Sequence, residues 1–598
     1  MELSAIATLV LMAAYFLAVS WRKWPDPLID GYQWYTAWQL SEGAVLYRDL
    51  SLAYGPLSSY FNAFLFKCFG PGMMVMVTAN LVIYGFILGL IYFTFRTAWG
   101  WLAAFAASAV FISVFSFSQL LRCGNFNFAA PYSHEIIHGT LVILIAVVVA
   151  ARWCREPSGK LAFLLGLCGG LASVLKPEFM LAGGLLGIAA LSLRRWRRQP
   201  IHFNEIIFII AGLAVPTLAF AAWFARTEPW PTAFMNASHA WWLVFAEKAH
   251  RAGFQQHAIG MNHPLKNILF QLGATASAVV MVGSVWAVGR AFNHPWSIGK
   301  RLATICLAVA LSYAARLTGG WLEVGLCLPG LIGILFIIRI RHLRREHCDS
   351  GQFSFGTVMG FMLIVLAGAM LARMSLRARI YDFGFYQAAF AGMVVSAAMV
   401  SDLPRWTGFN SLGRRIVLSG SVALLACACI SIAIVSHRIH STQTQPVGSG
   451  ADRFYAFNPM VDTTGELVKW TINQLATIPP HATLLVMPEG PLINYISRHK
   501  YPLKYWISIS GGATEEESRE IIEQLNESPP DYIVLISRPM SEHGVHKFGA
   551  DGTPAATTLK WIHDNYRIVA SKGGDPLRSY PKKGAMILQR NIVENSLQ

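Results

Sequence analysis

Charged residues are scarce in this sequence: Asp, Glu, Lys and Arg make up 13% of its 598 residues, while hydrophobic residues make up 54%. About a quarter of the residues in a soluble protein are charged, so the composition excludes an ordinary soluble protein and predicts an integral membrane protein. The length leaves room for a bilayer-spanning part and one soluble domain of ordinary size.

Several sequence motifs are also missing. There is no Cys-x-x-Cys pair, and the nine cysteines all lie before residue 430, mostly in apolar runs where Cys is a small buried hydrophobe. The tail has neither a Gly-x-Gly-x-x-Gly motif nor a P-loop, so nucleotide binding is not supported. Residues 1–20 are apolar but lack a basic start and a clear cleavage site, so we expect a retained first helix.

The positive charge is confined to the first three quarters of the chain. Before residue 440 there are 33 Lys and Arg against 16 Asp and Glu, a net charge of +17; after it there are 15 against 16, a net charge of −1. This distribution argues against nucleic acid as a partner. It indicates basic residues beside membrane spans and contact with anionic membrane lipids.

Apolar runs long enough to cross a bilayer predict a polytopic α-helical membrane protein with about 13 transmembrane helices. With a cytoplasmic N-terminus, this count places all five basic clusters on the cytoplasmic side, as the positive-inside rule requires. The runs begin near residues 2, 72, 100, 136, 161, 178, 204, 266, 302, 321, 353, 385 and 415, and the clusters lie at 152–160, 194–198, 300–301, 339–345 and 414–415.

This topology places the longer loops and the tail on the outer side of the cytoplasmic (inner) membrane. We expect a transmembrane domain over residues 1–437, with an exoplasmic first loop at 21–71, and an extracytoplasmic α/β domain over 438–598. Further outer loops fall at 118–135, 226–264 and 372–384. Long outer loops beside short inner ones suggest that function faces outward.

The tail alternates strand-like and helix-like segments, which favours a small α/β layer. Strands are predicted at 483–487, 532–536, 566–570 and 585–588. Thr514 with Glu517 is typical of a capping box that opens a helix to about residue 527, and a third helix is expected near 556–565.

The first outer loop contains four carboxylates in a chain that has few: Asp26, Asp30, Glu42 and Asp49. After Asp30 comes an aromatic run, Tyr32-Gln-Trp-Tyr-Thr-Ala-Trp38. This run could form a helix that lies at the membrane interface, or its rings could stack on a sugar. The plainer interpretation is a solvated loop with interface anchors.

The order of residues in this loop resembles the membrane glycosyltransferases of the GT-C fold. The matching residues are an Asp, Gly43-x-x-Leu-Tyr-Arg-Asp49, Tyr54-Gly-Pro-Leu57 and Phe69-Gly70 after a first transmembrane helix. The resemblance is closest to bacterial relatives of protein O-mannosyltransferases and aminoarabinose transferases. It continues through 127–135 and 169–178. In protein O-mannosyltransferases an Asp-Glu pair stands where this chain has Asp30-Gly31.

The resemblance implies an inverting hexosyl- or pentosyltransferase that uses a polyprenyl-phosphate sugar and a lipid, glycan or protein acceptor. It places the acidic residue of the first loop, a catalytic base or acceptor-orienting group, at Asp30, with Asp26 as the alternative. Such transfer needs a base and cations for the leaving phosphate. The candidate bases are Asp30, Glu135 and Asp49; the candidate phosphate ligands are Lys176, Arg373, Arg377 and Arg379; the candidate sugar or acceptor contacts are Asp26, Tyr35, Tyr54 and Tyr381.

Simpler roles for these cations stay open. Lys176 could snorkel or pair with Glu178, and the arginines could pair with Asp382.

Two further functions remain as alternatives. His134-Glu-Ile-Ile-His138 matches the His-Glu-x-x-His pattern of zinc proteases and could provide metal ligands. A transporter or flippase for lipid-linked sugars would instead show paired charges in mid-membrane and repeated halves, and neither is visible. No cofactor is established, and a divalent cation near Asp30 is a further candidate.

Overall fold

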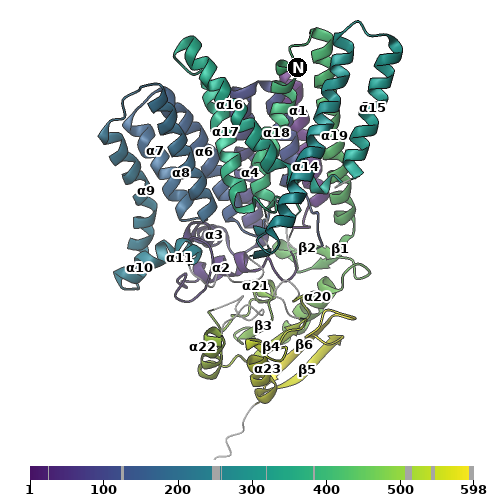
Figure 1. The fold of residues 1–598 in the computed structure, drawn as a ribbon. Helices are drawn as coiled ribbons and strands as arrows, with labels where there is room; N and C mark the ends of the chain where they lie inside the picture. Colours follow the sequence, from purple (N-terminus) through teal and green to yellow (C-terminus); the bar gives the residue numbers. More distant parts are fainter. Residues whose placement is uncertain are drawn as a thin grey trace, which may run out of the picture.

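The computed structural model describes the whole chain except residue 25 and residues 123–126, 246–255, 258, 318–319, 382–383, 505–514, 541–545 and 592–598. A bundle of long helices fills the upper part of Figure 1, and the C-terminal α/β region lies below it. The chain is therefore a polytopic helical protein with a C-terminal α/β region, as the sequence predicts.

Each of the thirteen apolar runs forms a helix in the bundle. Among the described residues, eleven helices are long and apolar enough to cross a membrane. Two others are shorter: α7 (Gly159–Ser173), about 22 Å long, and α5 (Trp101–Val110), which a π-helical turn continues to Ser116. The eleven are α1 (Glu2–Ser20), α4 (Met73–Trp99), α6 (Glu135–Arg155), α8 (Pro177–Trp196), α9 (Phe203–Phe224), α14 (Pro264–Asn293), α15 (Ile298–Leu317), α16 (Leu328–Ser350), α17 (Phe355–Leu371), α18 (Phe385–Trp406) and α19 (Ser411–Ser441).

The helices alternate in direction, so the loops divide between two ends of the bundle. The predicted basic clusters gather at the end that holds the N-terminus, where Glu2 pairs with Arg96 at 2.5 Å and Arg194 pairs with Glu205 at 2.9 Å. The first loop and the C-terminal region lie at the other end (Figure 1). The grouping of loops agrees with the sequence, while the side of the membrane that each end faces remains a prediction.

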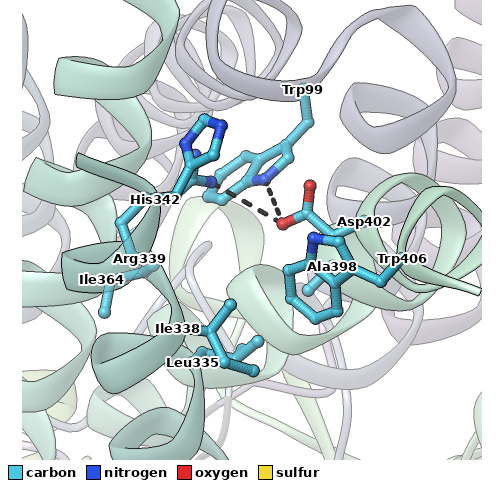
Figure 2. A pocket seen from close by; sticks show the side chains of 9 residues that line it. All are labelled: Trp99, Leu335, Ile338, Arg339, His342, Ile364, Ala398, Asp402 and Trp406. Carbon is cyan, nitrogen blue, oxygen red and sulfur yellow. Dashed lines mark hydrogen bonds and ion pairs between the residues drawn. The ribbon is translucent and has the colours of Figure 1, made fainter. Parts of the chain in front are cut away.

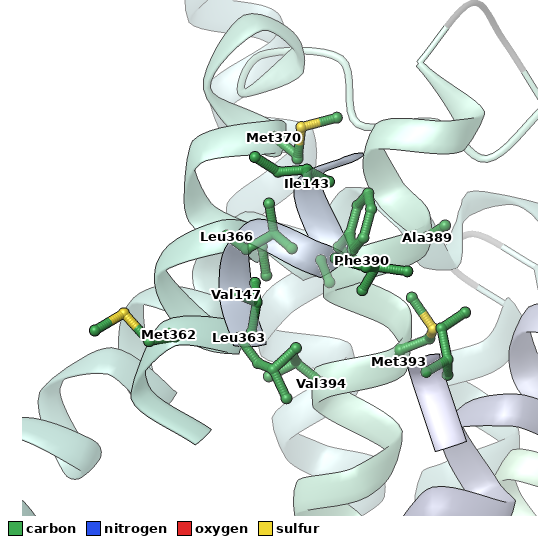
Figure 3. Close-up of a cluster of buried hydrophobic side chains, with 14 of the residues drawn as sticks. Ile143, Val147, Met362, Leu363, Leu366, Met370, Ala389, Phe390, Met393 and Val394 are labelled. Carbon is green, nitrogen blue, oxygen red and sulfur yellow. The ribbon is translucent and has the colours of Figure 1, made fainter. Parts of the chain in front are cut away.

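Three helices form the centre of the bundle. In each of α6, α17 and α18, 72% of the residues in an apolar 18-residue segment are buried, a larger share than in the other helices that could cross a membrane. Figure 3 shows how Ile143 and Val147 of α6 pack among Leu366 of α17 and Phe390 of α18. Outer helices such as α14 and α15 expose large apolar side chains, as lipid-facing helices do.

The first loop is folded and its aromatic run is buried, so the alternative interpretation of a solvated loop with interface anchors is wrong. Its aromatic run forms α2 (Tyr32–Ser41), in which Trp34 and Tyr35 are each 1% exposed. This helix packs against α3 (Pro56–Phe69) and against α21 (Pro491–Ser497) of the C-terminal region. Protein, and not lipid headgroups, covers these rings.

The C-terminal region begins after α19 ends at Ser441, four residues beyond the expected domain boundary. A hairpin of β1 (Gln443–Val447) and β2 (Phe454–Phe457) comes first, followed by α20 (Thr464–Leu475). A four-stranded sheet in the order β3-β4-β6-β5 follows, in which only β3 and β4 run parallel.

The strands of this sheet confirm the four predicted segments. They are β3 (Leu484–Met487), β4 (Tyr532–Ile536), β5 (Tyr566–Gly573) and β6 (Gly584–Arg590). The helices α22 (Glu515–Glu527) and α23 (Pro554–Asn565) lie near their predicted positions, and the capping residue Thr514 falls outside the described residues.

The sheet and the first loop share one hydrophobic core. Because side chains alternate along a strand, Leu484 and Val486 point to one face and belong to the same hydrophobic cluster as Trp34 and Tyr35 of the first loop. The other face, with Leu485, packs in a separate cluster under α22 and α23. The C-terminal region is thus docked on the first loop through apolar contacts.

Candidate functional site

Asp30 lies in the turn before α2 and is 1% exposed. Its Oδ2 accepts a hydrogen bond from the backbone N–H of Asp26 at 2.5 Å. The side chain of Asp26 in turn accepts the N–H groups of Leu28 and Ile29, at 2.9 and 3.1 Å. Asp26 therefore shapes the turn that holds Asp30, which is a structural role for the residue that the sequence offered as an acceptor contact.

Glu135 is the second buried carboxylate, at the first position of α6 and 0% exposed. Its Oε2 accepts hydrogen bonds from Ser133 Oγ at 2.5 Å and from Gln33 Nε2 of α2 at 3.2 Å. Its Oε1 is buried and bonds to no described residue. A buried carboxylate oxygen without a partner is costly, so it points to a site that a further group completes.

Lys176 lies at the junction of α7 and α8 and is 4% exposed. The first loop pairs with this junction: the N–H of Gly55 donates to Leu175 O at 2.8 Å, and that of Leu57 to Val174 O at 3.1 Å. A β-carbon on Gly55 would lie 2.2 Å from Val174 O, so only glycine permits this approach. The pairing places Tyr54 directly under the lysine.

The Lys176 ammonium is held by aromatic rings. Its Nζ lies 4.2 Å from the centre of the Tyr54 ring and 5.3 Å from that of Tyr386. Such cation–π contacts stabilise a desolvated cation without neutralising it. Among the described residues no carboxylate forms an ion pair with this lysine, so its charge remains available to an anion.

Arg373 is a second cation near Lys176. It pairs with Glu178, which also contacts the Tyr386 hydroxyl at 3.4 Å, and it acts electrostatically on Lys176. Glu178 therefore has Arg373 as its partner instead of Lys176. The arginine side chain is 43% exposed, so it borders the site from its open side.

The other two predicted arginines are engaged elsewhere in the 372–384 loop. Arg377 donates to the backbone oxygen of His257 at 3.0 Å. Arg379 pairs at 3.2 Å with Glu323, which also accepts the Tyr381 hydroxyl at 2.5 Å. The alternative partner Asp382 lies outside the described residues.

Two first-loop candidates also have local partners. Asp49 forms an ion pair with Arg48 at 2.8 Å and is 37% exposed, which makes it a surface residue and a poor candidate for a base. The pKa of Asp49 is held below its ordinary value by the hydrogen bonds of Arg48. The Tyr35 hydroxyl accepts the N–H of Tyr501 at 2.7 Å and so joins the first loop to the C-terminal region.

The two histidines of the protease-like pattern are buried, and their Nδ1 atoms have protein partners. His138 Nδ1 lies 2.8 Å from Ser58 Oγ, and His134 Nδ1 lies 3.2 Å from the Asn62 amide and 3.3 Å from that of Asn80. Within the described part of the chain, no group of three His, Cys, Asp or Glu side chains is arranged to hold a metal ion. A zinc protease needs such a group.

The sequence did not single out Tyr132, Glu489 or Arg538, although all three lie at this end. The pKa of Tyr132 is raised, first by burial and then by the charges around it, which include Asp30 and Glu489. Glu489 and Arg538 follow the adjacent strands β3 and β4. The sequence did contain a signal for Glu489 and Arg538, because each lies just after a predicted strand.

A pocket also exists at the opposite end of the bundle, where the basic clusters lie. Figure 2 shows Asp402 there, which accepts the Trp99 indole N–H at 2.8 Å and lies 3.7 Å from Arg339. Each charge in this pocket faces the opposite one, so it lacks the unneutralised cation that marks the Lys176 site.

No protein-family model matches the chain, and no curated protein matches it. Solved structures do. ArnT from Cupriavidus metallidurans bound to undecaprenyl phosphate is 12% identical, with a TM-score of 0.47, over 98% of this chain and 97% of that one. The Archaeoglobus fulgidus oligosaccharyltransferase complex with zinc and sulfate is 11% identical, with a TM-score of 0.43, over 88% and 67%. Its apo form is 13% identical, with a TM-score of 0.44, over 89% and 69%.

All three similarities extend over most of this chain. Because the identities are below 25% and the TM-scores are below 0.5, these similarities carry no argument about function. The argument for a function rests on the side chains described above.

Proposed function

We propose that this chain is a membrane glycosyltransferase that moves a sugar from a polyprenyl phosphate to an acceptor at the outer face of the membrane. The observation that carries the proposal is the buried, unneutralised Lys176 on the same loop-covered end of the bundle as the buried carboxylates Asp30 and Glu135. An anionic leaving group would pair with the lysine, and an acceptor that donates a proton would pair with a carboxylate.

The arrangement supports an inverting displacement. The acceptor oxygen or nitrogen attacks the anomeric carbon of the donor, and the bond between that carbon and the phosphate oxygen breaks. The acceptor proton passes to Asp30, and the polyprenyl phosphate leaves with its negative charge beside Lys176 and Arg373. A positioned base contributes about 10²- to 10⁴-fold to such a rate, and fixed cations stabilise the leaving phosphate.

Glu135 would contribute to this reaction from α6. Its carboxylate lies within the electrostatic reach of Lys176 and is joined to the first loop through Gln33. We assign it to hold the acceptor or the sugar hydroxyls through Oε1, because that atom is buried and bonds to no described residue. Asp30 remains the proposed base.

The experiment uses the purified full chain in lipid nanodiscs with radiolabelled undecaprenyl-phosphate hexose or pentose and a bacterial membrane extract as acceptor. The unchanged chain should release undecaprenyl phosphate and transfer the label. Asp30→Asn should lower the rate about 10²- to 10⁴-fold. Glu42→Gln, a first-loop carboxylate that is 43% exposed, is the matched control and should keep the rate.

The rival functions predict different results. A zinc protease would contain stoichiometric zinc and would lose peptide cleavage in Glu135→Gln while Asp30→Asn remained active. A flippase would move the labelled lipid across the bilayer without releasing its sugar. Either result, without sugar transfer by the unchanged chain, contradicts the proposal.

A further inference from the structure

The edge of the C-terminal sheet that approaches the membrane half is formed by the carboxyl ends of two parallel strands. Strands β3 and β4 pair in parallel from Leu484 with Tyr532 to Met487 with Leu535. Both therefore end at the same edge, and Glu489 and Arg538 follow them by two residues each. In open α/β sheets, ligands bind outside such carboxyl ends.

These two residues form a buried ion pair. Arg538 Nε lies 2.7 Å from Glu489 Oε2, and the side chains are 7% and 8% exposed. Removing two charges from water is costly, so a buried ion pair is weak evidence for a role in stability alone. The sheet could have used apolar residues here, as it does along β3 and β4.

The turn that carries Glu489 lies against the first loop at the residue after Asp30. A β-carbon on Gly31 would lie 1.9 Å from the backbone nitrogen of Leu492, so no side chain fits between the two segments. Leu492 is three residues after Glu489, in the first turn of α21. The close approach fixes the turn relative to Asp30.

Tyr132 lies within the electrostatic range of both carboxylates, Asp30 and Glu489. Tyr132 belongs to the membrane half, and its backbone oxygen accepts a hydrogen bond from the Tyr32 hydroxyl at 2.6 Å. The charges of Asp30, Glu489 and Arg538 act electrostatically on the Tyr132 hydroxyl. The charge of Glu489 also acts electrostatically on the hydroxyl of Tyr501, in the C-terminal region. Glu489 thus lies where the two parts of the protein meet beside Asp30.

We infer that the C-terminal region supplies a residue to the site: Glu489, held in place by Arg538, binds the hydroxyl or amine group of the acceptor beside Asp30. This inference rests on the proposed function, because it gives the acceptor side of the same reaction. Glu489 contacts the acceptor, whereas Arg538 is a positioning residue.

The first test is geometric and needs no activity. Tyr132→Cys combined with Glu489→Cys should be joined by a short bismaleimide, as mapped by mass spectrometry in the full chain. Tyr132→Cys combined with Asp531→Cys is the control, because Asp531 lies at the opposite end of β4. Equal cross-linking of both pairs, or none of the first, overturns the inference.

The second test separates acceptor binding from donor binding. In the nanodisc assay, Glu489→Gln should require about 10- to 150-fold more membrane extract for half-maximal transfer, the range expected for a lost hydrogen bond to a charged group. Binding of undecaprenyl phosphate should be unchanged. Arg538→Met should behave like Glu489→Gln, and Arg538→Lys should recover part of the loss.

A structural ion pair of the same region provides the control for stability. Lys583 Nζ lies 2.8 Å from Asp462 in the α20–β6 contact. Asp462→Asn should lower the melting temperature without changing the amount of extract required. If Glu489→Gln lowers only the melting temperature, the inference is wrong and the pair is structural. If the unchanged chain transfers no sugar although the cross-link forms, the proposed function fails, and the acceptor role of Glu489 fails with it.

Discussion

The buried charges of this protein are compensated in different ways, and the difference predicts their roles. Arg194 is fully buried and faces both oxygens of Glu205 at 2.9 Å, so it is neutralised. Lys176 is almost as buried but contacts the rings of Tyr54 and Tyr386. A lysine held by rings keeps its charge for a ligand, whereas a bidentate arginine–carboxylate pair does not.

The pair of Asp462 and Lys583 gives a prediction of pH dependence. Burial alone would raise the pKa of Asp462, but hydrogen bonds from Lys583 and Thr464 outweigh it and hold the pKa below its ordinary value. A carboxyl with a lowered folded pKa stabilises the protein above its unfolded pKa of about 3.9, and the contribution is lost as the pH falls through the folded pKa.

Asp462→Asn should therefore lower the melting temperature at pH 7, because it removes the carboxylate that pairs with Lys583. The difference from the unchanged chain should disappear in acid, below the folded pKa of Asp462. Glu156→Gln, whose side chain is 79% exposed, is the control and should have little effect. A constant difference between neutral and strongly acid pH would contradict the assignment.

At the scale of elements, apolar segments were predictable and contacts between distant segments were not. Thirteen helices and four strands follow from local hydrophobicity and periodicity, which act over a few turns. The burial of α2 was missed because its cover, α21, lies more than 450 residues away in the chain. The β1–β2 hairpin and α20 were also missed.

The contact between α2 and α21 depends on one small residue. We expect Gly31→Ala to separate the first loop from the C-terminal region, because its β-carbon would lie 1.9 Å from Leu492 N. Overpacking of this kind costs about 1–3 kcal/mol. Limited proteolysis and the melting temperature of the full chain measure the effect.

Gly85→Ala is the matched control for this substitution. Gly85 lies within α4, and nothing is within 4 Å of a β-carbon placed there, so alanine should be tolerated. Equal proteolysis of the two variants would show that Gly31 does not fix the contact.

At the scale of the whole molecule, the site combines parts that are distant in the chain. Asp30, Glu135, Lys176 and Tyr54 were chosen from the sequence, and the structure gathers them at one end of the bundle. These residues could be selected because carboxylates, a lysine and a tyrosine suit the proposed chemistry whatever the fold.

Other residues near the candidate site could not be assigned from the sequence. Asp49 resembled the buried carboxylates but is neutralised by Arg48 at the surface, which only the structure shows. Glu489 and Arg538 were missed because their position depends on how the sheet docks against the first loop. The expected division into two domains remains a proposal, since the two parts share a hydrophobic core.

The binding of undecaprenyl phosphate tests the central claim most directly. The unchanged chain in nanodiscs should bind undecaprenyl phosphate much more tightly than undecaprenol, which lacks the phosphate. Lys176→Met should remove most of this preference, a loss of about tenfold or more for a charge-assisted contact, and Lys176→Arg should keep part of it. If Lys176→Met binds the phosphate lipid as tightly as the unchanged chain does, the account is wrong.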